Sequence, residues 1–286
     1  DLGLDNDIFC FNVESAVELE IINELAAAKN KVASIALRIN PEVDAHTHAK
    51  ITTGMKENKF GINLSQLGGV LDKLKEMKHV KLIGIHSHIG SQITDMSSFR
   101  NLVIRFNEIQ EELEAHGVTV ENLNFGGGLG IDYYHPNHLS IPAFDNYFAA
   151  IHKLLQVRPG QQVHFEPGRS IVAQCGTLIS KVLYVKEGET KKFAILDAGF
   201  TELIRPAMYD AYHRIENISS DEAVETYDVV GPICESSDVF GKDVELNKAH
   251  RGDLIALRSA GAYGEVMASQ YNCRHLPKAY YSDTIK

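Results

Sequence analysis

Positive charge and cysteine are scarce in this chain, and long apolar runs are missing. Its 286 residues include 28 lysines and arginines against 38 aspartates and glutamates, which gives a formal net charge of -10. This balance is unfavourable for nucleic acid or an anionic membrane surface, so we expect neither as a partner. No apolar run approaches the ~20 residues that a membrane-spanning helix needs. The composition favours a globular protein with one large domain or two smaller ones.

The cysteines do not form a recognisable framework. Cys10, Cys175, Cys234 and Cys273 are far apart and include no CxxC pair. A chain of this length does not need disulfides to hold its fold, so we expect reduced thiols and a cytoplasmic location.

Both ends of the sequence read as strands. The apolar run from Ile8 to Phe11 follows closely on residue 1, and the stretch from Tyr280 to Lys286 closes the chain. We therefore expect that both ends are cut and that the sequence is part of a longer protein.

Short apolar runs alternate with amphipathic helical patterns over the first 170 or so residues. Ser15 and Glu18 have the spacing of a capping box, which predicts a helix start. The other helical patterns lie around Leu67 and at 99–116 and 144–155, and the expected strands are 9–12, 32–39, 80–86, 123–125 and 162–166. This alternation predicts an α/β fold with a parallel sheet or a (β/α) barrel.

The pattern changes near residue 170, where strands follow one another with little helix between them. These strands are expected at 176–185, 192–196, 225–230 and 253–257. We expect a partial (β/α) barrel over residues 1–172 and a mostly β domain over 173–286. The polar stretch from Asn40 to Asn63 has no period, and so long a loop is usually functional or lies at an interface.

The first motif is a run of three glycines, Gly126, Gly127 and Gly128, after the fourth strand. Consecutive glycines let backbone N–H groups approach an anion without interference from side chains. The spacing does not fit a Rossmann or Walker motif. We favour phosphate binding over the alternative of a tight turn that only needs positive φ.

The second motif follows the fifth strand, where Glu166 and Arg169 flank the turn of Pro167 and Gly168. Arg169 is a permanently charged fork suited to phosphate or carboxylate. The alternative is a strand end closed by a salt bridge. Because barrel enzymes often bind phosphate with the loops after late strands, the glycine run one unit earlier favours a site.

The third motif places His86 and His88 at the end of the third strand, followed by Ser91. Residues i and i+2 share a face, so the two histidines have the spacing to bind one metal ion. Alternatively, one imidazole stacks on a planar ligand while Ser91 donates a hydrogen bond. The β part holds weaker signals at Arg205, at Cys234 with Glu235, and at Tyr263.

Taken together and in this order, the motifs resemble the diaminopimelate decarboxylases. These are pyridoxal-phosphate enzymes whose fold joins a (β/α)8 barrel of the TIM type to a β domain. The matching stretches extend from Phe11 to Asn272 and cover nearly the whole chain. The ornithine and arginine decarboxylases share a looser version. The resemblance implies that this chain holds about five of the eight barrel strands, followed by a mostly β C-terminal domain.

The resemblance also implies how the cofactor, pyridoxal 5'-phosphate, is bound. Glu166 is expected to bond its pyridine nitrogen, so that the ring accepts the electrons released by loss of CO2. His88 is expected to stack on the ring, with Ser91 beside it and Tyr263 in contact with cofactor and substrate. The phosphate is expected to contact Gly126, Gly127, Gly128, Pro167, Gly168 and Arg169.

The implied substrate is meso-diaminopimelate, and the implied product is L-lysine. Cys234 is expected to reprotonate the carbanion and, with Glu235, to reach in from the partner subunit of a homodimer with shared active sites. Together with His88 and Glu166, Cys234 completes the implied catalytic set. The implied substrate ligands are Arg169, Arg205, Tyr209, Glu235 and Tyr263.

The residue chemistry agrees with that substrate. Arg205 can bind a distal carboxylate by a bidentate contact, and Glu235 can pair with a distal ammonium group. An ornithine-like substrate has no distal carboxylate, so a buried Arg205 would be left unpaired at a cost.

The family pattern is broken in one important place. The Schiff-base lysine belongs to a motif about three barrel strands before residue 1, and Lys56 and Lys59 belong to a different motif. Glu265 also stands where an apolar or aromatic residue is usual. We expect the chain by itself to be inactive.

Other functions remain open on the sequence. An ornithine- or arginine-type decarboxylase would use the same cofactor, and a non-catalytic protein would bind the cofactor without the lysine. A metal-dependent barrel hydrolase would use His86, His88 and Glu166, but it would leave the glycine run and Arg205 unexplained.

Overall fold

The computed structural model describes residues 1–43, 59–139 and 142–284. These form two compact units. The first contains Asp1–Gly130 and Ala143–Pro167, and the second contains Ile131–Pro142 and Gly168–Lys286. The chain thus joins the second unit for a short segment, returns to the first, and joins the second again. The expected domain boundary after residue 172 stays a prediction, and the short segment was not expected in the second unit.

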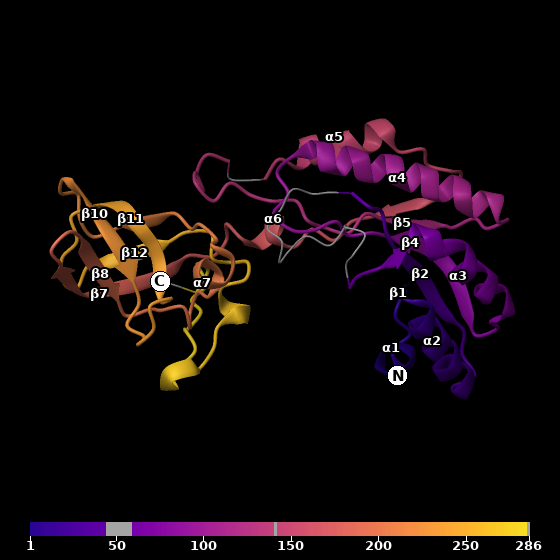
Figure 1. Ribbon diagram of the computed structural model, residues 1–286, viewed down its shortest axis with the longest axis horizontal. Helices are drawn as coiled ribbons and strands as arrows, with labels where there is room; N and C mark the ends of the chain where they lie inside the picture. The colour runs from indigo at the N-terminus through magenta and orange to yellow at the C-terminus, as the bar shows by residue number, and fades with distance from the viewer. Residues whose placement is uncertain (44–58, 140–141, 285–286) are drawn as a thin grey trace. The chain divides into compact units, whose positions relative to one another are not determined.

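The first unit is built on a parallel sheet whose strand order follows the chain (Figure 1). The order is β1-β2-β4-β5-β6, with β3 paired to β2, and every pair is parallel. A sheet that adds each new strand on the same side is wound like a (β/α) barrel, whereas a doubly wound sheet reverses its order. The expected α/β barrel class is confirmed. The strands are β1 (Phe11–Val13), β2 (Ala33–Asn40), β3 (Ile62–Asn63), β4 (Val80–His86), β5 (Asn122–Asn124) and β6 (Gln162–His164).

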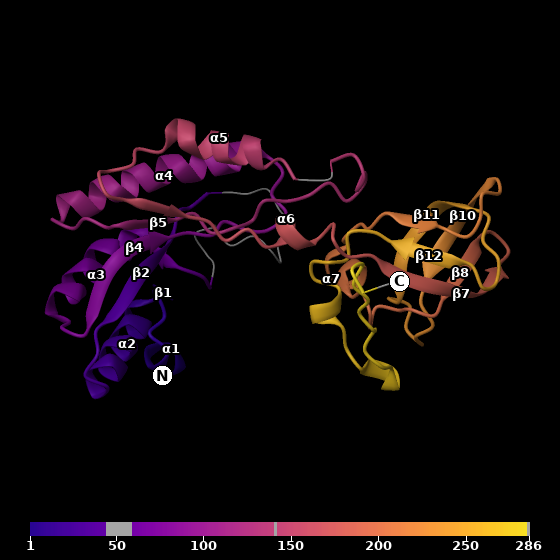
Figure 2. The same ribbon diagram turned by 180° about the vertical axis from the view of Figure 1, so that it is seen from behind.

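Amphipathic helices connect these strands and bury their apolar faces against the sheet. Helices α4 and α5 run side by side in both views (Figures 1 and 2) and contact each other. Phe106 of α4 stacks on Phe125 beyond β5, with the ring centroids 4.0 Å apart. The helices are α1 (Leu2–Asp5), α2 (Ala16–Ala28), α3 (Leu64–Glu76), α4 (Met96–Ala115) and α5 (Phe144–Leu154).

The start of α2 confirms half of the expected capping box. The Ser15 hydroxyl accepts a hydrogen bond from the Glu18 N–H at 3.1 Å. The Glu18 carboxylate, however, accepts from the N–H of Glu14 at 2.6 Å rather than from that of Ser15. The first bond satisfies a backbone donor that the helix itself leaves without a partner, and the second ties the residue before the N-cap to the first turn.

The first expected strand, at residues 9–12, exists but starts two residues later, and the expected burial of Ile8 and Phe9 was wrong. The strand begins only at Phe11, and the side chains of Ile8 and Phe9 are 44% and 65% exposed. The N–H of Ile8 donates to the Gly3 carbonyl, so it closes the turn after α1 instead of pairing with a strand. The middle of the long polar stretch, residues 44–58, lies outside the described residues.

The second unit is mostly β, as expected, and its sheet is mostly antiparallel. Its order is β11-β10-β8-β7-β12-β9, and among the strand pairs in the described residues only β8–β10 is parallel. Its apolar core includes Leu196, Tyr227 and Ile255. The strands are β7 (Leu178–Glu187), β8 (Lys192–Leu196), β9 (Ile215–Asn217), β10 (Val224–Val230), β11 (Val239–Asn247) and β12 (Leu254–Leu257). The short helices are α6 (Arg169–Val172), α7 (Arg205–Tyr209) and the 3-10 turns η1 (Glu265–Met267) and η2 (Tyr271–Cys273).

Three expectations for the second unit need correction. The sequence pattern missed β9, which has three residues, and β11, whose alternation is interrupted by Lys242 and Asp243 where the pairing with β10 shifts register. The expected strand from Tyr280 is absent over the described residues up to Thr284, where the Thr284 N–H instead closes a turn onto the Tyr281 carbonyl.

None of the described helices is long and apolar enough to cross a membrane.

Candidate active site

Three motifs of the first unit follow three neighbouring parallel strands. In the sheet register, His86 at the end of β4 is aligned with Asn124 of β5, which is aligned with His164 of β6. The loops after these strands therefore leave the sheet at the same edge, the edge where α/β enzymes bind their ligands.

Side chains from two neighbouring strands lie beside the two oxygens of the Glu166 carboxylate. Asn124 Nδ2 donates to Oε1 at 2.9 Å, and His86 Nε2 lies 3.4 Å from Oε2. The second contact lacks hydrogen-bond geometry, since both ring nitrogens of buried His86 are without a hydrogen-bond partner. The nearby His86, with help from Asn124, holds the pKa of Glu166 at about 2 although partial burial raises it. Glu166 is therefore a carboxylate at neutral pH.

His88 lies in the loop beyond His86 and is uncharged at neutral pH. Its Nδ1 accepts a hydrogen bond from the Gly127 N–H at 3.2 Å. Burial, aided by the positive charge of Arg38, lowers the pKa of His88 to about 4. The accepted bond leaves the proton on Nε2, so the ring is a neutral imidazole that can stack on a planar ligand.

The glycine run has a packing role in addition to any role in binding. A Cβ on Gly127 would lie 2.2 Å from the Glu166 carbonyl oxygen, and one on Gly126 would lie 2.5 Å from the Ser87 carbonyl oxygen. Gly126 also has φ of +63°. The loop after β5 can therefore pack between the loops after β4 and β6 only with glycine at these positions. A phosphate cradle at this run stays a prediction.

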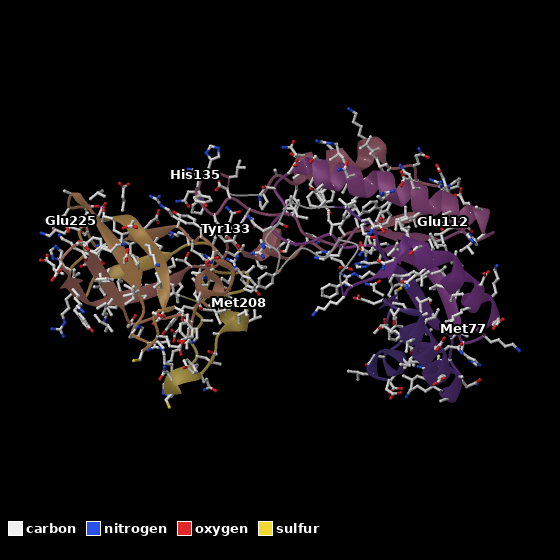
Figure 3. All side chains as sticks on the ribbon, in the orientation of Figure 1. Met77, Glu112, Tyr133, His135, Met208 and Glu225 are labelled. Carbon is white, nitrogen blue, oxygen red and sulfur yellow. The ribbon has the colours of Figure 1, made fainter. Side chains whose placement is uncertain are left out.

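Two arginines of the second unit are buried against one tyrosine. Arg169 and Arg205 are 6% and 5% exposed, and Tyr133 is 6% exposed. Arg169 Nη1 donates to the Tyr133 hydroxyl at 2.7 Å, and the Arg205 guanidinium carbon lies 4.9 Å from the centroid of the same ring. Tyr133 comes from the short segment that the second unit takes from the middle of the chain (Figure 3).

Arg205 has a second buried neighbour. Its Nη1 lies 2.7 Å from Nε2 of His213, and Nδ1 of His213 lies 2.8 Å from the Arg258 carbonyl oxygen. Burial lowers the pKa of Arg205 from its ordinary value, and the charge of Arg169 lowers it further. Within residues 1–43, 59–139 and 142–284, Arg205 forms no ion pair with a carboxylate. A buried charge of this kind favours an anionic ligand.

Cys234 and Glu235 lie on an exposed loop of the second unit. The buried carboxylate of Asp238 anchors this loop, because it accepts hydrogen bonds from the N–H groups of Phe200 and Ile233, both at 2.7 Å. Burial raises the pKa of Asp238 above its usual range. The Tyr271 hydroxyl donates a hydrogen bond to the Glu235 carboxylate and so orients it.

Among the remaining expected residues, Tyr263 and Gly168 lie close to Arg169. The Arg169 guanidinium carbon lies 5.2 Å from the centroid of the Tyr263 ring. Gly168 precedes α6, where a Cβ would lie 3.9 Å from the Tyr263 hydroxyl. Tyr209 is half-buried at the end of α7, and Ser91 is half-buried in the loop after β4.

Sequence reasoning missed five residues of these arrangements. Each lies near a residue that the sequence singles out, but its residue type alone does not indicate which side chain it contacts. They are Asn124, Tyr133, His213, Asp238 and Tyr271.

Comparison with known proteins identifies the family. Residues 2–173 match the pyridoxal binding domain of the pyridoxal-dependent decarboxylases. Diaminopimelate decarboxylase of Bacteroides thetaiotaomicron is 66% identical over 285 residues, which cover all of this chain and 74% of that protein. The chain belongs to the diaminopimelate decarboxylase family. The metal-dependent hydrolase is thereby set aside, and the described part of the chain contains no group of three or more side chains arranged to hold a metal ion.

Solved structures of this family share the fold. Diaminopimelate decarboxylase of Helicobacter pylori, complexed with L-lysine, is 40% identical with a TM-score of 0.87, over 95% of this chain and 67% of that one. The enzyme of Methanocaldococcus jannaschii, also in complex with L-lysine, is 41% identical with a TM-score of 0.86, over 96% and 64%. The chain thus spans about two thirds of the length of these solved relatives.

Proposed function

We propose that the protein containing this chain is a pyridoxal-phosphate-dependent carboxy-lyase that converts meso-2,6-diaminopimelate into L-lysine and CO2, the last step of lysine biosynthesis. The observation that carries this proposal is the buried Arg205, which lacks a carboxylate partner within the described residues and lies against Tyr133 beside Arg169. A substrate with a second carboxylate supplies the missing anion.

The residues proposed to bind the cofactor have donors and acceptors that suit its ring and its phosphate. The Glu166 carboxylate is ionised at neutral pH and suits a protonated pyridine nitrogen. The neutral His88 ring suits stacking, with Ser91 beside it. The proposed phosphate contacts are Gly126, Gly127, Gly128, Pro167, Gly168 and Arg169. When bound, the cofactor supplies an electron sink for the bond that breaks on loss of CO2.

The chain's own residues hold the charges in place for that reaction. Asn124 holds one oxygen of the Glu166 carboxylate by a hydrogen bond, and His86 lies beside the other oxygen. Arg205 binds the substrate carboxylate that is retained in the product, with Arg169, Tyr209 and Tyr263 as further substrate ligands. Glu235 pairs with the distal ammonium group.

Cys234 is proposed to protonate the carbon that loses CO2. Its exposure and that of Glu235 suit residues that serve the active site of a second subunit. We therefore propose a homodimer with shared active sites, in which Asp238 fixes the position of this loop.

The test is CO2 release by the full-length protein loaded with pyridoxal phosphate. We expect release from meso-diaminopimelate and at most slow release from ornithine or arginine, which lack a distal carboxylate. Preference for ornithine or arginine would overturn the substrate proposal. Absence of CO2 release from all three, with the cofactor bound, would instead favour a non-catalytic cofactor-binding protein.

A further inference from the structure

His213 faces Arg205 with only one arrangement of protons available to it. An arginine side chain is always a donor, so the 2.7 Å contact with Arg205 Nη1 requires that His213 Nε2 accept. The proton then lies on Nδ1, which donates to the Arg258 carbonyl oxygen at 2.8 Å. Two directed hydrogen bonds fix the ring, which is 1% exposed.

The ring remains neutral in this position. Burial lowers the pKa of His213 to about 4, and the charges of Arg205 and Arg169 lower it as well, against the Arg258 carbonyl. The Tyr133 ring closes another side in an edge-on contact, with centroids 5.2 Å apart. His213 is thus a rigid, uncharged acceptor.

An uncharged acceptor has a different effect on Arg205 from that of a carboxylate. A carboxylate would both orient the guanidinium and neutralise it. His213 orients the guanidinium through one N–H and leaves its positive charge for another anion. The remaining N–H groups of Arg205 keep their fixed planar geometry relative to the one that is held.

We propose that His213 is a positioning residue that holds Arg205 for the retained carboxylate of the substrate and so gives the site its preference for ligands that carry this carboxylate. The inference rests on the proposed function and deepens it. His213 itself touches Arg205 rather than substrate.

Two variants separate the two hydrogen bonds of His213. In His213→Gln the amide oxygen can take the place of Nε2 and accept from Arg205. In His213→Asn the shorter amide can replace Nδ1 and keep the bond to Arg258, but it does not reach Arg205. Both variants carry an amide side chain, and they differ in which of the two hydrogen bonds of His213 they restore.

Two ligands isolate the carboxylate. L-lysine keeps the carboxylate that decarboxylation leaves in place, and cadaverine is the same diamine without it. We would measure the binding of each to the full-length protein loaded with cofactor by calorimetry. His213→Asn should weaken L-lysine binding by about 10- to 100-fold, the loss expected for one hydrogen bond to a charged group, and leave cadaverine binding within about 3-fold. His213→Gln should keep both affinities within about 3-fold of wild type.

The outcomes are decisive and separable from those of the proposed function. Equal weakening of both ligands by His213→Asn, or an unchanged affinity for L-lysine, overturns the positioning role even if the wild type releases CO2 from diaminopimelate. If the wild type does not release CO2 from diaminopimelate, the proposed function itself fails.

A measurement on the wild type keeps the inference testable if a variant does not fold. Nitrogen NMR of 15N-histidine-labelled protein should show His213 as a neutral ring protonated at Nδ1. A ring protonated at Nε2, or a charged ring at pH 7, overturns the inference, because neither can accept from Arg205 in the observed contact.

Discussion

Asn124 connects the glycine run to the Glu166 carboxylate through the two atoms of its amide. Nδ2 donates to Glu166 Oε1 at 2.9 Å, and Oδ1 accepts from the Gly126 N–H, also at 2.9 Å. One side chain at the end of β5 therefore contacts both the loop that follows β5 and the carboxylate that follows β6.

This relationship predicts the effect of Asn124→Asp. The substitution keeps the acceptor for Gly126 but replaces the donor to Glu166 with a second negative charge, and a like charge raises a carboxylate pKa. We expect the pKa of Glu166, about 2 in the wild type, to rise by a unit or more. The pH dependence of the absorbance of the bound cofactor in the full-length protein measures this. Identical titrations of variant and wild type would contradict the role of Asn124.

The free energy of unfolding should decrease as the pH is lowered, because two histidines are held neutral in the folded chain. The pKa values of His88 and His213 are both lowered to about 4 from 6.5. The unfolded chain thus binds more protons between pH 6.5 and 4, so the free energy of unfolding decreases as pH falls through that window. Each shift corresponds to a loss on the order of 3 kcal/mol.

Urea unfolding at pH 7, 6 and 5 measures this slope. The matched control is His213→Gln, which removes one of the two titrating rings and should reduce the slope by roughly half. A slope that the substitution leaves unchanged would mean that His213 is not held neutral in the folded protein.

Gly127→Ala should be strongly destabilising. The new Cβ would lie 2.2 Å from the Glu166 carbonyl oxygen, so the backbone of one loop has to move. We expect a loss of about 2 kcal/mol or more in the free energy of unfolding. Gly69→Ala is the control, because a Cβ at this exposed position of α3 meets nothing within 4 Å and alanine favours helix by up to ~1 kcal/mol. Thermal melts of both variants test the contrast, which fails if the two lose stability alike.

Asp238→Asn should loosen the loop that carries Cys234. An amide can accept one of the two backbone hydrogen bonds, from Phe200 and Ile233, but then turns its own donor toward the other N–H. We expect a loss of about 1–3 kcal/mol. Asp221→Asn, at an exposed position of the same unit, should change the free energy of unfolding by less than about 0.5 kcal/mol. Urea midpoints for the two variants provide the comparison.

Much of the fold was predictable because its strands are short apolar runs between clear helical patterns. The strand from Val80 to His86 was predicted at its observed bounds, since both faces of a barrel strand are buried and its letters are almost all apolar. Strand β11 was missed because Lys242 and Asp243 break the alternation at a bulge, where register follows the partner strand rather than local pattern.

Sequence composition singles out the candidate-site residues that carry distinctive chemistry, but not those that position them. The motifs around Glu166 and Arg205 stand out by composition. His213 and Tyr133 are ordinary residue types whose role comes from contacts that no local pattern encodes. His213 contacts Arg205 and also the distant Arg258, and Tyr133 contacts Arg169. No spacing rule connects Tyr133 to Arg169, because the two are joined by tertiary packing.

The segment Ile131–Pro142 limits how this protein can be synthesised and rearranged. It leaves the ribosome before α5 and β6, yet Tyr133 packs against Arg169 and Arg205, which are made later. Tyr133 therefore cannot form these contacts until the rest of the first unit and the start of the second have been synthesised. The same segment matters for chimeras in which the β unit is replaced by that of a relative. A single crossover after residue 167 would combine a foreign sheet with the native Tyr133. A functional chimera therefore has to carry the segment together with its partners.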